Sequence, residues 1–196
     1  MTPQQKRLVL PIAILALGLV ALIGVGLFIV SGGGEKGRAS AVGGAFSLVD
    51  QTGARVTDAT YRGAPSLVFF GFTHCPDVCP TTLFEISEIL RKLPKDARLS
   101  ALFVTVDPER DTPELMKSYL ASFDPRISGL SGTREEIDVI IKAYRVYAKK
   151  IPTEKGQYTM DHTAIVYMMD KQGRFVNALN IQQPPEAAAR EVQKLL

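Results

Sequence analysis

The sequence predicts an α/β domain with a mixed central sheet, preceded by one apolar helix that is long enough to cross a membrane. Two observations carry this prediction. From Ala45 to Leu196, short apolar runs typical of buried strands alternate with segments whose apolar residues recur at helical spacing. Before them, the 23 residues from Leu8 to Val30 carry no charge, and six of the next 14, Ser31 to Gly44, are Gly. The chain is therefore expected to consist of an apolar span, a flexible Gly-rich linker and a folded domain.

Each predicted element of the domain has a local signal. Ser66 to Phe72 and Leu99 to Val106 are apolar runs that indicate buried strands. Thr112 with Pro113 is a typical helix start, and Thr133 to Glu136 form a capping box. A cysteine-containing turn directly after the first core strand makes the order typical of a thioredoxin-like domain. In sequence, we expect an edge hairpin at Ala45 to Asp50 and Gly53 to Val56, a strand at Ser66 to Phe72, a helix at Thr81 to Leu93, a strand at Leu99 to Val106, a helix after Thr112 with Leu115, Tyr119 and Phe123 on one face, a helix after Thr133, strands at Thr163 to Met169 and Arg174 to Ile181, and a closing helix at Pro185 to Leu196.

The apolar span Leu8 to Val30 is predicted to be a transmembrane anchor, because its length suffices for ~30 Å of hydrocarbon. A cleaved signal peptide is the alternative, but its apolar region is ~7 to 15 residues long and is followed closely by small residues. Here the sequence Ala39-Ser40-Ala41 lies nine residues beyond the span. Lys6 and Arg7 precede the span, so the positive-inside tendency places residues 1–7 in the cytoplasm. We expect a single-pass protein of the cytoplasmic (inner) membrane, with residues 45–196 in the periplasm.

The charge and cysteine content exclude several classes of protein. The 23 Lys+Arg and 20 Asp+Glu give a net charge of +3, and Lys6 and Arg7 account for two of the bases. The outer part is then close to neutral, with no basic stripe that indicates nucleic-acid binding. Two cysteines are too few for a small fold held together by disulfides. In an oxidising compartment, such a pair indicates a specific local role.

Cys75 and Cys79 are spaced for a metal ion rather than for a disulfide. Near a helix start, Cβ atoms four residues apart are ~5 to 6 Å apart, whereas a disulfide prefers ~3.5 to 4.5 Å. Two thiolates on one metal ion keep their sulfurs nearly 4 Å apart, so the spacing favours chelation without forbidding a disulfide. Pro76 suits the first helical position, and Pro80 is expected to kink or delay the helix. Free N–H groups at a helix start are expected to stabilise both thiolates.

Two sulfurs alone leave a metal ion short of ligands, and the chain has two histidines that can supply a third. His162 lies directly before the apolar run Ala164 to Met169, which places it on a loop that enters a strand. By itself, a lone histidine in such a place is more often incidental than a ligand. His74 is adjacent to Cys75, and adjacent side chains of an extended segment point apart, so His74 is the weaker candidate.

Three segments resemble the Sco/SenC family: Gly71 to Pro80 (GFTHCPDVCP), Val106 to Glu114 (VDPERDTPE) and Asp161 to Thr163 (DHT). The resemblance covers the chain from Phe46 onward and includes the membrane anchor. It implies a thioredoxin-like domain in which Cys75, Cys79 and His162 bind one copper ion. It also implies a role in building the dinuclear copper centre of cytochrome c oxidase subunit II.

Two further acidic residues lie in the family segments and have no assigned role. Asp107 and Asp111 are candidates to support the ligands or to face a partner protein. An interpretation as turn formers and a cap before the next helix is at least equally consistent with the sequence.

Ligand chemistry supports copper independently of the resemblance. Two thiolates and an imidazole suit Cu(I), can also hold Cu(II), and exclude Mg and Ca. Zinc is chemically possible with the same residues and a water. The leading hypothesis is a metallochaperone, which is not an enzyme; it passes copper from a donor that the sequence does not identify to its target.

The alternative functions use the same cysteines. One is a thiol-disulfide reductase that reduces the target through Cys75 and Cys79. The other is a thioredoxin-like peroxidase, which needs one activated cysteine and a resolving cysteine, a division of roles that the motif does not indicate.

The domain boundary leads to a first prediction. A fragment from Ala45 to Leu196 is expected to be a soluble, folded monomer, because the linker has no apolar content to pack. Size-exclusion chromatography and circular dichroism check this. Insoluble or unfolded material would place the boundary elsewhere.

Overall fold

The computed structural model describes residues 17–24 and 42–196. The chain forms two units, Met1–Ala39 and Ser40–Leu196, which are described separately. In the first unit, residues 17–24 are helical and exposed. The predicted anchor, Leu8 to Val30, extends on both sides beyond these residues, and the tail 1–7 and most of the linker also lie outside the described part. No helix within the described residues has the length and apolarity needed to cross a bilayer.

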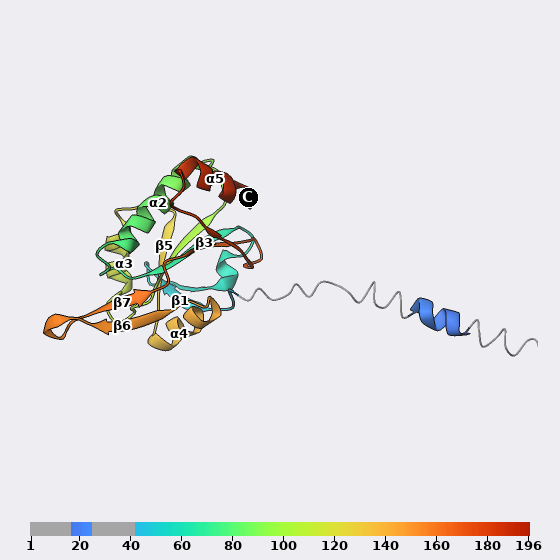
Figure 1. Cartoon of the computed structure of the whole chain (residues 1–196), viewed down its shortest axis with the longest axis horizontal. Coiled ribbons are helices and arrows are strands. Elements are labelled where there is room, and N and C mark those ends of the chain that lie inside the picture. Colours follow the sequence, from blue (N-terminus) through green and yellow to red (C-terminus); the bar gives the residue numbers. More distant parts are fainter. Residues whose placement is uncertain (1–16, 25–41) are drawn as a thin grey trace, which may run out of the picture. The chain divides into compact units, whose positions relative to one another are not determined.

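The second unit is built on a mixed seven-stranded sheet (Figure 1). The strand order is β2-β1-β5-β4-β3-β8-β9, in which β3, β4 and β5 run parallel and the other neighbours pair antiparallel. The predicted mixed α/β class is thus confirmed. The strands are β1 (Ser47–Asp50), β2 (Arg55–Thr57), β3 (Ser66–Gly71), β4 (Ser100–Thr105), β5 (Ile127–Ser131), β8 (Val166–Met169) and β9 (Phe175–Leu179).

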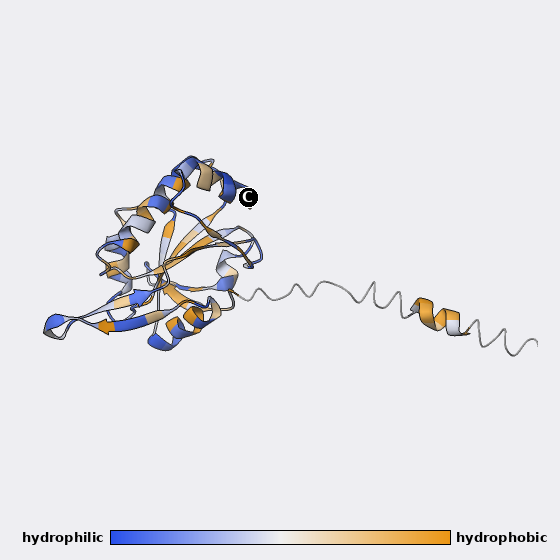
Figure 2. Ribbon diagram, viewed as in Figure 1, coloured by the Kyte–Doolittle hydropathy of each residue, from blue (hydrophilic) through white to orange (hydrophobic). Residues whose placement is uncertain are grey.

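Helices cover both faces of this sheet (Figure 1). Helix α2 packs against α5, and α3 packs against β5, while α4 lies beside β1 on the other side. Apolar residues gather in the strands between these layers, and the outer helix faces are hydrophilic (Figure 2). The helices are α2 (Val78–Lys92), α3 (Pro113–Leu120), α4 (Arg134–Ala143) and α5 (Pro185–Gln193), with 3-10 turns η1 (Asp58–Tyr61) and η2 (Glu154–Gly156).

The central strand and two helix caps form as predicted. All six residues of β3 are buried, as expected for a strand covered on both faces. The Thr112 side chain accepts a hydrogen bond from the Leu115 N–H at the start of α3, with Pro113 in the first turn. Thr133 and Glu136 form the predicted reciprocal capping box of α4. These caps fix where both helices begin.

Two local expectations about the helices were wrong. Pro80 does not delay α2, which begins at Val78; Pro80 sits in the first turn, where its missing N–H has no partner within the helix in any case. The first helical N–H bond is therefore donated by Thr81 to the Asp77 carbonyl. On α3, Met116 and Leu120 are buried, whereas Leu115 is 38% exposed. The buried face of α3 is thus centred one residue further along the chain than the predicted face that began at Leu115.

A second, two-stranded sheet was not predicted. Strands β6 (Ala148–Pro152) and β7 (Tyr158–His162) form an antiparallel hairpin that projects from the body of the domain (Figure 1). Charged and apolar residues are mixed in both strands, Met160 is their one buried residue, and β6 shows no apolar alternation. The predicted strand Thr163 to Met169 is shorter than expected, since β8 begins at Val166. His162 therefore ends β7 instead of lying in a loop, and it pairs with Ala148 at the base of the hairpin.

Candidate metal centre

The structure brings the three predicted ligands together. The Sγ atoms of Cys75 and Cys79 and one ring nitrogen of His162 all lie within 4.8 Å of one another. Cys75 lies in the loop after β3, Cys79 lies in the first turn of α2, and His162 ends β7. The site is therefore at the carboxyl end of a central strand, where open α/β sheets bind their ligands.

The two cysteines differ in their access to solvent. Cys75 is partly buried, and Cys79 is completely buried. Both are free thiols, and the Cys79 N–H donates to the Cys75 sulfur over 3.4 Å. The Cys75 N–H donates to the Phe72 carbonyl, which holds the turn that leads out of β3. One sulfur is thus open to an approaching molecule, while the other forms the floor of the site.

Burial dominates the electrostatics of Cys79. It raises the pKa of the Cys79 thiol well above its ordinary value, and the charges of Cys75 and Asp111 act in the same direction. A hydrogen bond from the Phe72 backbone lowers the pKa but does not compensate. The expectation that the helix start stabilises both thiolates was therefore wrong for Cys79. A bound cation would provide the missing compensation and displace the proton.

His162 is held as a neutral ligand with one nitrogen available. Burial lowers its pKa, so the imidazole is neutral near pH 7. Its Nδ1 lies 3.1 Å from the Thr163 carbonyl oxygen, which accepts only from a protonated nitrogen. The lone pair is then on Nε2, which lies 3.4 Å from the Cys79 sulfur. The rings of Phe69 and Phe72 pack edge-on against the imidazole, with centroids 6.4 and 5.8 Å away, and fix its orientation.

Asp111 anchors the loop that carries the cysteines. Its side chain is completely buried and accepts hydrogen bonds from the Thr73 N–H (3.1 Å), the Thr73 hydroxyl (2.6 Å) and the Thr105 hydroxyl (2.6 Å). Its backbone carbonyl accepts a bond from the Ser131 hydroxyl (2.7 Å). Asp111 thus connects the carboxyl ends of β3, β4 and β5. This is support from behind the ligands, and the alternative that Asp111 faces a partner protein was wrong.

Asp107 supports the hairpin that carries His162. It is completely buried, pairs with the guanidinium of Arg110 and accepts a 2.9 Å hydrogen bond from the Tyr158 hydroxyl. The Arg110 guanidinium lies 3.9 Å from the centre of the Tyr158 ring and donates to the Tyr158 carbonyl. These contacts join the segment after β4 to the start of β7. Arg110 and Tyr158 were not singled out from the sequence, although Arg110 lies within the motif that contains Asp107.

His74 does not join the cluster. Its Nδ1 lies 3.0 Å from the Thr73 hydroxyl and 3.8 Å from a carboxyl oxygen of Asp111. The described metal-binding group contains only Cys75, Cys79 and His162.

Gly71 is a further residue of the site that the sequence did not reveal. A Cβ atom at this position would lie 2.8 Å from the Cys79 sulfur and 2.6 Å from the Phe103 ring. The last residue of β3 must therefore lack a side chain for Cys79 to sit against the strand. The sequence signal that could have revealed Gly71 was its position at the start of the Gly71 to Pro80 segment.

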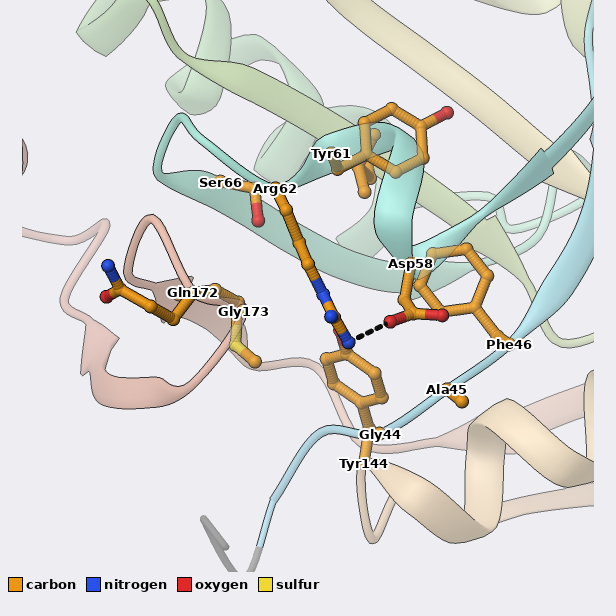
Figure 3. A pocket seen from close by; sticks show the side chains of 12 residues that line it. Gly44, Ala45, Phe46, Asp58, Tyr61, Arg62, Ser66, Tyr144, Gln172 and Gly173 are labelled. Atoms are coloured by element: carbon orange, nitrogen blue, oxygen red, sulfur yellow. Dashed lines mark hydrogen bonds and ion pairs between the residues drawn. The ribbon is translucent and has the colours of Figure 1, made fainter. Parts of the chain in front are cut away.

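A separate cavity lies at the other end of β3. It has a volume of about 90 Å³ and is lined by residues that include Phe46, Tyr61, Ser66 and Tyr144. Arg62 and Asp58, which also line it, form an ion pair (Figure 3). Ser66 begins the strand whose carboxyl end leads to Cys75, so this cavity is not part of the cysteine site.

Comparisons with known proteins agree on one family. Residues 34–196 match the SCO1/SenC family model. The chain is 42% identical over 157 residues to Protein sco1 of Schizosaccharomyces pombe, covering 77% of this chain and 59% of that protein. It is 43% identical over 140 residues to the mitochondrial Protein SCO1 homolog of Homo sapiens, covering 69% and 46%. The chain thus spans about half the length of these curated relatives.

Solved structures show the same fold. Bradyrhizobium japonicum ScoI with copper bound is 58% identical, with a TM-score of 0.77, covering 79% of this chain and 99% of that one. Yeast Sco1 with copper bound is 37% identical, with a TM-score of 0.72, covering 78% and 87%. At 21% identity and a TM-score of 0.63, BsSco shares the fold, with 82% of this chain and 96% of that chain covered.

The close contact at Gly71 gives a second prediction. In Gly71→Ala, the new methyl group must displace the Cys79 sulfur or the Phe103 ring, so affinity for a soft metal ion such as Cu(I) is expected to fall about tenfold or more. Competition with a chromophoric Cu(I) chelator measures this. Gly129→Ala is the matched control. Gly129 lies on a different strand, β5, and its Cβ would crowd Leu120 and Met116 of α3 at 2.7 and 2.8 Å.

Both glycine variants are expected to lose roughly 1–3 kcal/mol of stability through overpacking, but only Gly71→Ala should lose metal affinity beyond that effect. Equal metal affinity in the two variants would show that Gly71 has no special role at the site.

Proposed function

This chain belongs to the SCO1/SenC family, and from that premise and the geometry of its site we propose that it carries one copper ion, bound by Cys75, Cys79 and His162, for the assembly of cytochrome c oxidase. The observation that carries the proposal is the convergence of two sulfurs and one imidazole nitrogen within 4.8 Å. Relatives of the same fold, ScoI of Bradyrhizobium japonicum and Sco1 of yeast, have structures with copper bound.

The donor atoms suit copper in both oxidation states. Thiolates are soft ligands that favour Cu(I), and the imidazole adds the nitrogen donor that Cu(II) requires. His162 is neutral and keeps Nε2 free, so it needs no proton loss before it binds. The cysteines must lose their protons, and copper binding therefore releases protons and weakens as pH falls.

The unequal burial of the two sulfurs suits a protein that gives its metal away. Cys79 is completely buried, whereas Cys75 and His162 are each partly exposed, with the imidazole packed against Phe69 and Phe72. An incoming ligand from another protein can reach the ion beside the partly exposed Cys75 and His162 and displace one of them while the buried Cys79 still holds it. Such stepwise exchange moves copper without a chemical conversion, so the protein acts as a metallochaperone and not as an enzyme.

The proposed target is the dinuclear copper centre of cytochrome c oxidase subunit II. We propose that Leu8 to Val30 anchors the chain in the cytoplasmic membrane and that the linker Ser31 to Gly44 lets a monomeric domain reach this target from the periplasmic side. The uncharged span of 23 residues and the preceding Lys6 and Arg7 support this topology. The protein that supplies copper is not indicated by any residue described above.

A thiol-disulfide reductase that acts on the same target is the second candidate. The free thiols of Cys75 and Cys79 and the accessibility of Cys75 favour it. The raised pKa of Cys79 leaves the accessible Cys75 as the attacking thiol of such a reaction. The placement of the His162 Nε2 beside the sulfurs speaks against the reductase, because a two-cysteine reaction does not use it.

The third prediction separates these candidates through His162→Ala, which leaves both sulfurs in place. Copper affinity is expected to fall at least ~10 to 100-fold, because loss of a direct ligand exceeds the cost of losing a supporting contact. Cu(II) should suffer more than Cu(I), which two thiolates can hold alone. Chelator competition measures both, and oxidase activity of cells at limiting copper should fall.

Cys75→Ser is the comparison variant, since it removes a ligand and half of the dithiol. If His162→Ala cells assemble oxidase normally at limiting copper and Cys75→Ser cells do not, the chaperone function is rejected in favour of the reductase.

The fourth prediction concerns oxidation. A disulfide between Cys75 and Cys79 consumes both thiolates, so the oxidised protein is expected to bind no copper at this site and to recover binding with reductant. Metal analysis after gel filtration measures the stoichiometry. About one copper per chain in the fully oxidised protein would contradict the proposed ligands.

A further inference from the structure

Arg110 contacts both the start of β7 and one of the rings that hold His162. Its Nε donates to the buried carboxylate of Asp107, and its Nη1 donates to the Tyr158 carbonyl over 3.1 Å. The guanidinium lies 3.9 Å from the centroid of the Tyr158 ring and 5.8 Å from that of the Phe72 ring. Phe72 in turn packs edge-on against the His162 imidazole, with ring centroids 5.8 Å apart. One side chain therefore connects the first residue of β7 with a ring that flanks the ligand at its end.

These contacts lie along one face of β7. Tyr158 and His162 are four residues apart in this strand, so their side chains point to the same side. Met160, which lies between them on that side, is buried, as expected for a face turned toward the domain. Arg110 contacts the first of these side chains and Phe72 contacts the last. A shift of β7 against Arg110 would therefore also move His162 against Phe72.

The flat shape of the guanidinium is essential to this packing. Its third nitrogen, Nη2, is buried and has no hydrogen-bond partner among the described residues. A buried N–H group without an acceptor costs free energy, whereas contact with the face of an aromatic ring stabilises a cation. The rings of Tyr158 and Phe72 therefore offset this cost. A lysine at this position would keep the charge, but its ammonium group cannot stack flat or donate from a fixed fork.

We infer that Arg110 is a positioning residue of the copper site, which holds Tyr158 and Phe72 in place so that the His162 imidazole presents Nε2 to the metal ion. The inference rests on the proposed copper site and adds a residue that does not itself bind the metal. Its effect should be larger for Cu(II), which requires the nitrogen donor, than for Cu(I), which two thiolates can hold alone.

Arg110→Lys tests this inference in the full-length protein, purified in detergent. The lysine keeps a positive charge beside Asp107 but loses the stacking on both rings. Cu(II) affinity, measured by chelator competition, is expected to fall about tenfold, as for other residues that support a ligand, and Cu(I) affinity is expected to fall less. The imidazole nitrogen coupling in the pulsed EPR spectrum of the Cu(II) protein is expected to change, because the ring is held less firmly. A nitrogen coupling equal to the parent's overturns the inference, whatever the affinity.

The matched control is Arg126→Lys. Arg126 also pairs with a buried aspartate, Asp124, and its side chain is 32% exposed, compared with 25% for Arg110. It lies directly before β5, at the opposite end of the parallel strands from Cys75. This variant should keep the parent's Cu(II) affinity and nitrogen coupling, and thermal unfolding measures the stability that each variant loses. An equal loss of Cu(II) affinity in both variants would be a general effect of destabilisation and would overturn the inference.

A double-mutant cycle with His162→Ala shows whether Arg110 acts through His162. In the His162→Ala background, Arg110→Lys is expected to change Cu(II) affinity by no more than about twofold, which is the scatter of additive effects. If Arg110→Lys causes the same loss in both backgrounds, Arg110 acts independently of His162, and only its positioning role is rejected. If His162→Ala alone keeps the parent's Cu(II) affinity, the proposed ligand set is wrong, and the inference falls with it.

Discussion

The rest of the site depends on the hydrogen bonds that the buried side chain of Asp111 accepts. A carboxyl group without hydrogen bonds would be costly in the interior, and here three donors from Thr73 and Thr105 satisfy it. These bonds hold together the ends of β3 and β4, and the Asp111 carbonyl adds Ser131 at the end of β5. The turn after β3 is thereby fixed, which places Cys75 at the rim of the site and starts α2 where Cys79 faces inward.

The second half of the site depends on a hairpin that the sheet does not contain. His162 ends β7, whose other end is tied to Asp107 and Arg110 through Tyr158. Phe69 and Phe72 hold the imidazole from the β3 side. The cysteines come from the β3–α2 turn, which Asp111 holds, and His162 comes from the β6–β7 hairpin, which Asp107 holds. Both aspartates lie in one short segment, Val106 to Glu114, so this segment helps to place the cysteine sulfurs and the His162 ring next to each other.

Elements with strong local signals could be predicted from the sequence. The fully buried strand β3 and the caps at Thr112 and Thr133 form where local patterns placed them. Strands β5, β6 and β7 were missed, because Ile127–Ser131 contains Ser and Gly and the hairpin strands mix charged and apolar residues. The face of α3 was misjudged because Leu115, Tyr119 and Phe123 also recur at helical spacing, although tertiary packing buries Met116 and Leu120 instead.

In the candidate site too, features with a local sequence signal could be predicted, and features that depend on tertiary packing could not. The spacing of Cys75 and Cys79 indicated chelation, but no local pattern distinguished His162 from an incidental histidine; that step needed the family resemblance, and the fold then placed its Nε2 beside Cys79. The raised pKa of Cys79 follows from burial, which a helix-start argument does not include. Gly71 matters through contacts across the fold, which no single segment of sequence reveals.

X-ray absorption spectroscopy of the copper-loaded protein tests the central claim most directly, because it counts the atoms bound to the metal. The account predicts two sulfur ligands and one imidazole nitrogen per copper ion, with the imidazole signal lost in His162→Ala and one sulfur lost in Cys75→Ser. Copper surrounded only by nitrogen and oxygen, or a spectrum that neither substitution changes, would contradict it.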